Sequence, residues 1–217
     1  EPFNSSFEGT FTFGSGFKVS SGVSSFRIGK AGTISGSSIV SESAGTIRID
    51  RAITASGQIS IYGTSVFPNE NIESTTAGAG VLLRTTAEIS VAASKRIRTN
   101  GGSIVLWADS DNNSAGLVRL LSGATLCSTG GTCGSTTTGG GDIVIGGGIP
   151  STASPSRPAG AAAGSGATYN TTGTTTTTGV QLGTMGVTGG GAKIYSAGGN
   201  VQIYGRMHSS PGAAWAA

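Results

Sequence analysis

A short phrase that joins a glycine turn to an alternating apolar strand occurs four times in the chain. Each copy opens on Gly-Gly or Ser-Gly, continues with one polar residue and ends in a run of Ile, Val or Leu alternating with other residues. No helix-like pattern separates the copies. A repeated strand–turn unit is typical of a solenoid, in which each coil stacks on the one before. The copies lie at 56–63, 101–107, 140–146 and 198–205.

The spacing of the four phrases is irregular. The glycines that precede the polar residue, Gly57, Gly102, Gly141 and Gly199, are 45, 39 and 58 positions apart. Coils of ~20–30 residues would place about two coils in each interval, with loops inserted between strands. The irregularity argues against the strict repetition of an ice-binding or calcium-binding roll.

The composition supports many short strands joined by tight turns. Glycine supplies 39 of the 217 residues, far above the usual ~7%. Hydrophobic residues make up 36% of the chain and alternate in register, which argues against disorder. The net charge of +3 comes from few charges, and the one basic cluster, at 95–98, is expected to be a solvent-facing strand or turn. A nucleic-acid partner would need a denser basic patch.

Alternation of period two predicts which side chains line the core. The pattern is clear at 47–49, 59–61 and 89–91, and strands are expected at intervals of ~8–12 residues from 31 to 107. We therefore expect an all-β fold, a right-handed parallel β-helix with irregular coils and loop insertions. Its interior should contain Ile47, Ile49, Ile59 and Ile61.

Composition divides the chain into three parts. Residues 1–30 are rich in phenylalanine, residues 31–207 carry the strand pattern, and residues 208–217 form a C-terminal tail. Within the solenoid, 147–179 is rich in Pro, Ala, Gly and Thr and is expected to be a long insertion. No signal peptide is visible, and no stretch is apolar for the ~20 residues of a membrane-spanning helix.

The phenylalanine-rich start is expected either to cap the solenoid or to dock onto another copy. An open coil end exposes backbone donors and apolar core, so it needs a cover. Strand addition by a second copy would supply one. The predicted assembly interface consists of Phe3, Phe7, Phe11, Phe13 and Phe17.

The two cysteines, Cys127 and Cys133, are predicted to form a local disulfide. The glycine-containing segment between them lets their Cα atoms approach to ~5.5 Å. A disulfide implies an oxidising compartment. A metal site would need more ligands, and the single histidine, His208, is distant in sequence.

Oxygen-bearing side chains alternate at Asp109, Asp111 and Asn113, as in the opening of a calcium loop. Ser114 and Leu120 then occupy the positions where such a loop has glycine and glutamate. An Asx-rich turn at a coil corner is the favoured interpretation. Calcium is the one ion the pattern suggests, and no other cofactor is expected.

The run from Ile97 to Asp111 resembles the repeat regions of very large bacterial surface proteins, the filamentous-haemagglutinin-like exoproteins of two-partner secretion systems. The segments 139–148, 180–183 and 198–206 continue this resemblance in the same order, so that it covers roughly 45–207. The resemblance implies a right-handed parallel β-helix, secretion through an outer-membrane pore, and adhesion or matrix roles. The family's secretion domain and its asparagine motifs are not recognisable in this chain.

The resulting functional prediction is a secreted or surface-displayed structural protein, not an enzyme. It would be a subunit or segment of a bacterial fibre, sheath or adhesin that assembles end to end with copies of itself or flanking repeats. One alternative is an adhesin that binds cell-surface glycans through loops 63–80 and 147–179. Aromatic residues that end or follow strands would then stack on sugars or, as we favour, cover the coil: Tyr62, Trp107, Tyr195 and Tyr204.

A second alternative is a β-helical polysaccharide lyase or hydrolase. Such enzymes need clustered carboxylates in a groove. Only the pairs Asp109/Asp111 and Glu70/Glu73 are close in sequence, although stacked coils could bring distant acids together at ~4.8 Å.

Overall fold

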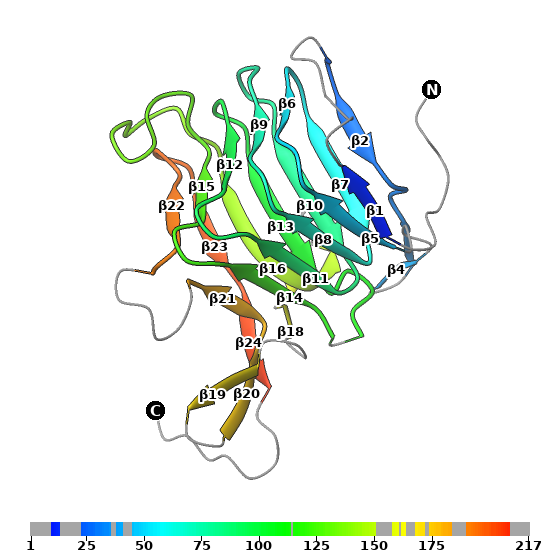
Figure 1. Ribbon diagram of the computed structural model, residues 1–217. Helices are drawn as coiled ribbons and strands as arrows, with labels where there is room; N and C mark the ends of the chain where they lie inside the picture. Colours follow the sequence, from blue (N-terminus) through cyan, green and yellow to red (C-terminus); the bar gives the residue numbers. More distant parts are fainter. Residues whose placement is uncertain are drawn as a thin grey trace.

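The chain folds into a parallel β-helix (Figure 1). The computed structural model describes residues 10–13, 23–35, 38–40, 45–113, 115–150, 158–160, 162–163, 168–171, 174–183 and 190–208. These residues form strands, turns and loops and include no helix. The described residues therefore contain no helix that is long and apolar enough to cross a membrane. The predicted all-β solenoid is confirmed.

Three sheets, here numbered 1 to 3, surround the core, and the chain visits them in a fixed order. Sheet 1 contains β1 (Thr10–Phe13), β5 (Thr46–Ile49), β8 (Ser65–Pro68), β11 (Glu88–Val91), β14 (Leu117–Leu120) and β21 (Val180–Leu182). Sheet 2 contains β6 (Ile53–Ala55), β9 (Ile72–Ser74), β12 (Arg96–Thr99), β15 (Thr125–Cys127) and β22 (Lys193–Tyr195). Sheet 3 contains β2 (Phe26–Ile28), β7 (Ile59–Gly63), β10 (Val81–Thr85), β13 (Ile104–Ala108), β16 (Ile143–Pro150) and β23 (Val201–Ile203).

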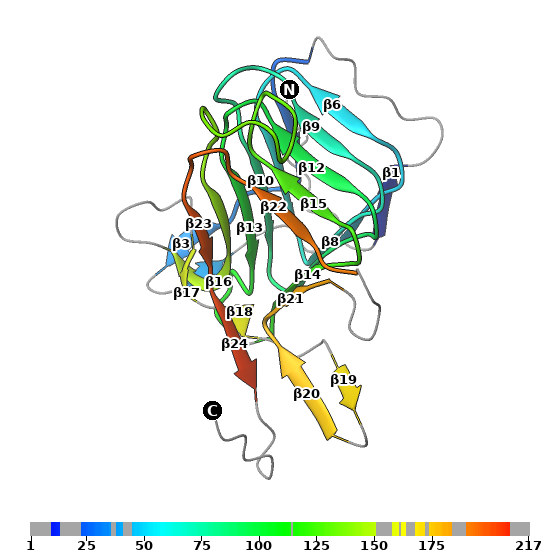
Figure 2. The same cartoon turned by 90° about the vertical axis from the view of Figure 1, so that its left-hand side faces the viewer.

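One strand from each sheet makes a coil, and five complete coils stack from β5–β6–β7 to β21–β22–β23. The pairing between successive coils is parallel and in register; in sheet 3, for example, Val81 lies opposite both Ile59 and Ile104. Figures 1 and 2 show the strands of each sheet side by side, with the last coil at one end of the stack.

The core is a set of aliphatic columns that run along the axis of the stack. Burying each Ile or Val side chain contributes roughly 1.5–3 kcal/mol, so stacked columns can stabilise a narrow interior. The predicted inward positions are confirmed, because Ile47 is 1% exposed and Ile49, Ile59 and Ile61 are fully buried. The central columns of the three sheets are Ile47–Val66–Ile89–Val118, Ile53–Ile72–Ile97–Leu126 and Ile59–Val81–Ile104–Ile143.

The recurring glycine of the repeated phrase lies where the backbones of adjacent coils touch. A Cβ atom on Gly102 would overlap the backbone of Ala79, one on Gly141 would overlap the backbone of Gly102, and one on Gly199 would overlap that of Gly141. Only a residue without a side chain fits such a close approach. The glycine of each phrase is therefore needed for adjacent coils to stack closely at one corner of the solenoid.

The pairing corrects the prediction of two coils per phrase. The first interval does hold two coils, since β10 lies between β7 and β13. In the later intervals the prediction is wrong, because Ile104 pairs directly with Ile143 and Ile143 pairs directly with Val201. Each of these longer intervals is a single coil that carries an insertion.

Two further segments differ from expectation. Residues 63–80, which the glycan-binding alternative assigns to a contact loop, contain β8 and β9, in which Val66 and Ile72 are fully buried. The strands expected near 33–34 and 39–40 do exist, yet they are not part of a coil. They pair with each other as an antiparallel hairpin, β3 (Thr33–Ser35) with β4 (Ser38–Val40).

The predicted insertion leaves the stack after β16 and returns at β21. It contains β17 (Pro158–Gly160), β18 (Ala162–Ala163), β19 (Thr168–Thr171) and β20 (Thr174–Thr178). β17 pairs antiparallel with the end of β16, and β19 with β20. After the last coil, β24 (Gly205–His208) pairs with β18 and β20. Figures 1 and 2 show β19, β20 and β24 extending away from the stack.

Candidate functional site

The last coil leaves the apolar interior of the solenoid open. β21, β22 and β23 carry Leu182, Ile194 and Val201, which extend the buried columns of the three sheets. Leu182 is nevertheless 44% exposed, Val201 45% and Ile203 41%, and Ile194 is only partly buried. Their neighbours one coil earlier, Leu120, Leu126, Ile143 and Ile145, are fully buried. We call Leu182, Ile194, Val201 and Ile203 the open coil end.

The opposite end of the stack is covered. Ile53 and Ala55 lie on β6, the edge strand of sheet 2, and are 1% and 0% exposed. Ile28, on the edge strand of sheet 3, is 7% exposed. Val23 lies against the next coil, where its carbonyl oxygen accepts hydrogen bonds from Ser56 N (2.9 Å) and Ser56 Oγ (2.7 Å). The two ends of the solenoid are therefore chemically different.

The phenylalanine-rich segment supplies two strands to the covered end. β1 pairs with β5, which places Phe11 opposite Ile47 and Phe13 opposite Ile49 in the backbone register. β2 pairs with β7. Three residues of the predicted assembly interface, Phe3, Phe7 and Phe17, lie outside the described residues. The role of this segment in assembly stays a prediction.

A second apolar cluster covers the outer face of sheet 3. It consists of Tyr62, Leu82, Val105, Trp107 and Val144, none more than 8% exposed. The Arg84 guanidinium lies 4.8 Å from the centre of the Tyr62 ring and 5.3 Å from that of Trp107, close enough for cation–π attraction. Trp107 Nε1 donates a hydrogen bond to Gly148 O at 3.0 Å.

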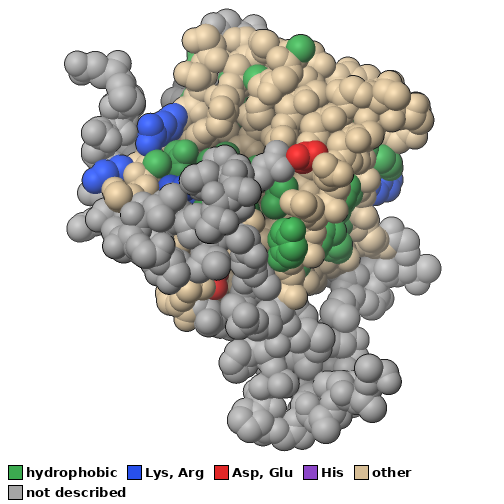
Figure 3. All heavy atoms as spheres, turned by 180° about the vertical axis from the view of Figure 1, so that it is seen from behind, with side chains coloured by type: hydrophobic (Ala, Val, Ile, Leu, Met, Phe, Trp, Pro, Cys, Tyr) green, Lys and Arg blue, Asp and Glu red, His purple; other side chains and the backbone are tan. Residues whose placement is uncertain are grey.

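Among the four aromatic residues considered for sugar stacking, Tyr62 and Trp107 are thus buried and cover the coil. Tyr195 is partly buried, and Tyr204 is 37% exposed. Seen from behind, hydrophobic side chains reach the surface in a few groups, and charged side chains are sparse (Figure 3).

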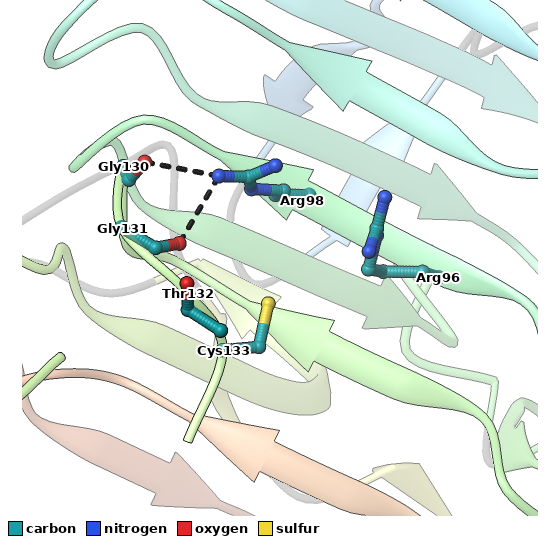
Figure 4. Close-up of a pocket in the computed structure, with 6 residues that line it drawn as sticks. All are labelled: Arg96, Arg98, Gly130, Gly131, Thr132 and Cys133. Atoms are coloured by element: carbon teal, nitrogen blue, oxygen red, sulfur yellow. Dashed lines mark hydrogen bonds between the residues drawn. The ribbon is translucent and has the colours of Figure 1, made fainter. Parts of the chain in front are cut away.

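The disulfide-bonded loop forms a hollow on the outer face of sheet 2 (Figure 4). Cys127, at the end of β15, is joined to Cys133 with a Cα–Cα distance of 5.9 Å, and its side chain is fully buried. The loop closed by this disulfide stands beside β12. The resulting space of about 470 Å³, here called the Arg96 hollow, is lined by Arg96, Arg98, Gly130, Gly131, Thr132 and Cys133.

Three basic residues at 95–98 have different environments. Lys95 Nζ pairs with Glu70 Oε1 at 2.8 Å, and Arg98 Nη1 pairs with Glu73 Oε1 at 3.2 Å. Arg98 Nη2 also donates to Gly130 O (2.9 Å) and Gly131 O (3.1 Å). These contacts anchor Arg98 to the disulfide loop.

Arg96 differs from both neighbours, because no hydrogen bond or ion pair engages its guanidinium in the part of the chain that the structure describes. Its backbone N–H donates to Asn71 Oδ1 at 2.9 Å, which holds the strand in place. Figure 4 shows Arg98 reaching to the loop while Arg96 stands apart at the side of the hollow. The expectation of a merely solvent-facing cluster missed this arrangement.

The predicted calcium residues form a turn. Asp109 and Asn112 have left-handed backbone conformations, with φ of 53° and 57°, and Asn112 N donates to Asp109 O at 2.9 Å. Asn113 Nδ2 donates to Asp111 Oδ2 at 2.8 Å, so these two side chains lie together. No group of three or more His, Cys, Asp or Glu side chains suited to a metal occurs among the described residues. The geometry agrees with the favoured Asx turn, and calcium binding stays a prediction.

The carboxylates considered for catalysis have structural partners. Glu70 and Glu73 form ion pairs with Lys95 and Arg98.

Comparison with known proteins adds no relationship. No protein-family model matches the chain, and neither the curated proteins nor the solved structures contain a significant match. The resemblance to filamentous-haemagglutinin-like exoproteins therefore stays a proposal that depends on the quoted motifs.

Proposed function

We propose that this protein is a structural β-solenoid, a subunit or segment of a secreted bacterial surface fibre, sheath or adhesin that assembles end to end. The observation that supports the proposal is the open coil end, where apolar side chains remain exposed in columns that every earlier coil buries. A further parallel coil would bury these side chains and pair the outer edges of β21, β22 and β23, which no strand of the described residues occupies.

The covered end provides the complementary partner for a head-to-tail contact between two copies. Among the described residues β1, β2 and β6 are the last strands of their sheets, and we propose that this end receives the open coil end of a neighbour. Contacts between two different ends are heterologous, and they generate an open filament unless the rotation between copies closes a ring. Stiffness along the filament would come from the continuous backbone ladders of the three sheets.

Electron microscopy of the purified chain, combined with circular dichroism, tests this proposal. We expect unbranched filaments of constant width, whose mass grows with protein concentration while the β-strand signal is preserved. A chain that remains monomeric at high concentration would overturn self-assembly. It would leave only the possibility that flanking repeats of a longer protein cover the open coil end.

A further inference from the structure

We propose that the Arg96 hollow is a binding site for the carboxylate of an acidic polysaccharide, a polymer of uronate sugars. The inference goes beyond assembly and does not depend on it. The hollow lies on the outer side of the stack, two strands in from the β22 edge of sheet 2. Stacking of copies at the coil ends would leave it accessible.

Arg96 indicates that the ligand carries a negative charge. Its side chain is partly buried, stands at the side of the hollow and makes no hydrogen bond or ion pair within the described part of the chain. A guanidinium presents a planar fork of donors that matches a carboxylate in a bidentate geometry. Glu73, which forms an ion pair with Arg98 of the hollow, is already occupied by that contact. A carboxylate from outside would complete the pairing of Arg96.

The disulfide loop indicates that the ligand also carries hydroxyl groups. The carbonyl oxygens of Gly130 and Gly131 line the hollow and each accept one hydrogen bond from Arg98. A carbonyl oxygen has a second lone pair, which accepts from a donor. A simple carboxylate brings only acceptors, whereas a uronate sugar brings a carboxylate for Arg96 and hydroxyl donors for these carbonyls.

The size and stiffness of the hollow suit a sugar. About 470 Å³ falls within the ~300–1,000 Å³ of small-molecule sites. The loop that forms one wall is closed by the Cys127–Cys133 disulfide and held by Arg98, so it is set before a ligand arrives. Preorganised walls reduce the conformational entropy lost on binding.

A second cation indicates a polymer. The register places Arg96 opposite Thr125 and Thr125 opposite Lys193, so that Arg96 and Lys193 occupy one outward column of sheet 2. Strands are spaced ~4.8 Å apart, which puts the two positions about 10 Å apart. Lys193 is exposed and makes no ion pair with any described residue. A chain with carboxylates on successive sugars can meet both cations.

Isothermal titration of the full chain with oligogalacturonate, at low ionic strength, tests the inference. We expect Arg96→Gln to weaken binding at least tenfold, because glutamine cannot form the bidentate charge-assisted hydrogen bonds of a guanidinium with a carboxylate. Arg51→Gln, which removes an exposed arginine that lies between β5 and β6 and does not line the hollow, should leave the affinity unchanged. The methyl-esterified oligosaccharide should not bind, because it lacks the charge.

Other probes separate this ligand from other polyanions. If poly-glutamate or dextran sulfate binds as tightly as oligogalacturonate, the uronate assignment is wrong. The same holds if the unmodified chain shows no binding, or if Arg96→Gln binds as well as the parent. Should Arg96→Gln fail to fold by circular dichroism, Lys193→Gln provides the test from an exposed position. It should weaken the polymer several-fold and leave monomeric galacturonate unaffected, and an unchanged affinity for the polymer would overturn the two-cation site.

Discussion

Val201 lies directly opposite Ile143 in the parallel register of sheet 3, yet Ile143 is fully buried and Val201 is 45% exposed. Ile203 and Ile145, two residues further along the same strands, differ in the same way. The difference comes from position in the stack, because β16 has a coil on both sides and β23 on one only. Burial of apolar surface is worth ~25 cal/mol per Å², so a further coil would be stabilised by covering these side chains.

Replacing equivalent residues in the buried and open coils should have unequal effects. Ile145→Ala should lower the free energy of unfolding by ~2–5 kcal/mol, because it leaves a cavity in a packed column. Ile203→Ala, in the same column, should cost less than ~1 kcal/mol in the monomer. Urea unfolding at a concentration where the chain is monomeric measures both. Equal losses would mean that Ile203 is already buried.

The glycine of the repeated phrase can be tested against a glycine that has space. Gly141→Ala places a Cβ against the backbone of Gly102 and should lower the free energy of unfolding by ~1–3 kcal/mol. At Gly191 a Cβ would meet nothing within 4 Å, and its φ lies outside the left-handed region. Gly191→Ala should therefore be neutral or slightly stabilising. Thermal unfolding of the two variants compares them, and equal stability would show that coil contact does not require the glycine.

The disulfide should stabilise the fold modestly. It closes a loop between cysteines only six positions apart, for which loop-closure entropy predicts about 2 kcal/mol. A reducing agent should lower the free energy of unfolding of the parent by this amount. The Cys127→Ser/Cys133→Ser variant should start at the lower value and not respond to the reductant. A parent chain insensitive to full reduction would show that the loop is held by its other contacts alone.

The core could be predicted where the inward positions are uniformly aliphatic. Ile47, Ile49, Ile59 and Ile61 alternate with polar or outward residues, and period two is visible without knowledge of the fold. The strand β9 was missed because one of its buried positions is polar. Ser74 is 1% exposed, and its Oγ donates to Gly57 O at 2.8 Å, so a satisfied hydroxyl takes the place of an aliphatic side chain.

The number of coils could not be predicted from the phrase alone. The strand β10 is introduced by Ala79-Gly80 in place of a glycine pair, so its phrase does not resemble the other copies. Alternation also cannot distinguish a coil strand from a hairpin strand. β3 and β4 have the same pattern as the coils, yet they pair with each other in the antiparallel direction.

The candidate binding site depended on contacts that sequence distance hides. A coil of 25 residues brings Lys95 over Glu70 and Arg98 over Glu73, which leaves Arg96 as the one cation of the cluster without an acidic partner among the described residues. The coil length was needed to know which basic residue has an acidic partner. The open coil end was also hidden, since Val201 and Ile203 have the same alternation as buried strands.

A comparison of the Ile203→Lys and Gln202→Lys variants with the parent by sedimentation velocity tests end-to-end assembly most directly. The two residues are neighbours on β23; Ile203 extends a core column, whereas Gln202 lies in the outward column next to Val144. Because burying an unpaired charge is costly, Ile203→Lys should block the addition of another coil. We expect the parent and Gln202→Lys to form large assemblies at high concentration and Ile203→Lys to remain a folded monomer. Assemblies of unchanged size in Ile203→Lys would contradict assembly through the open coil end.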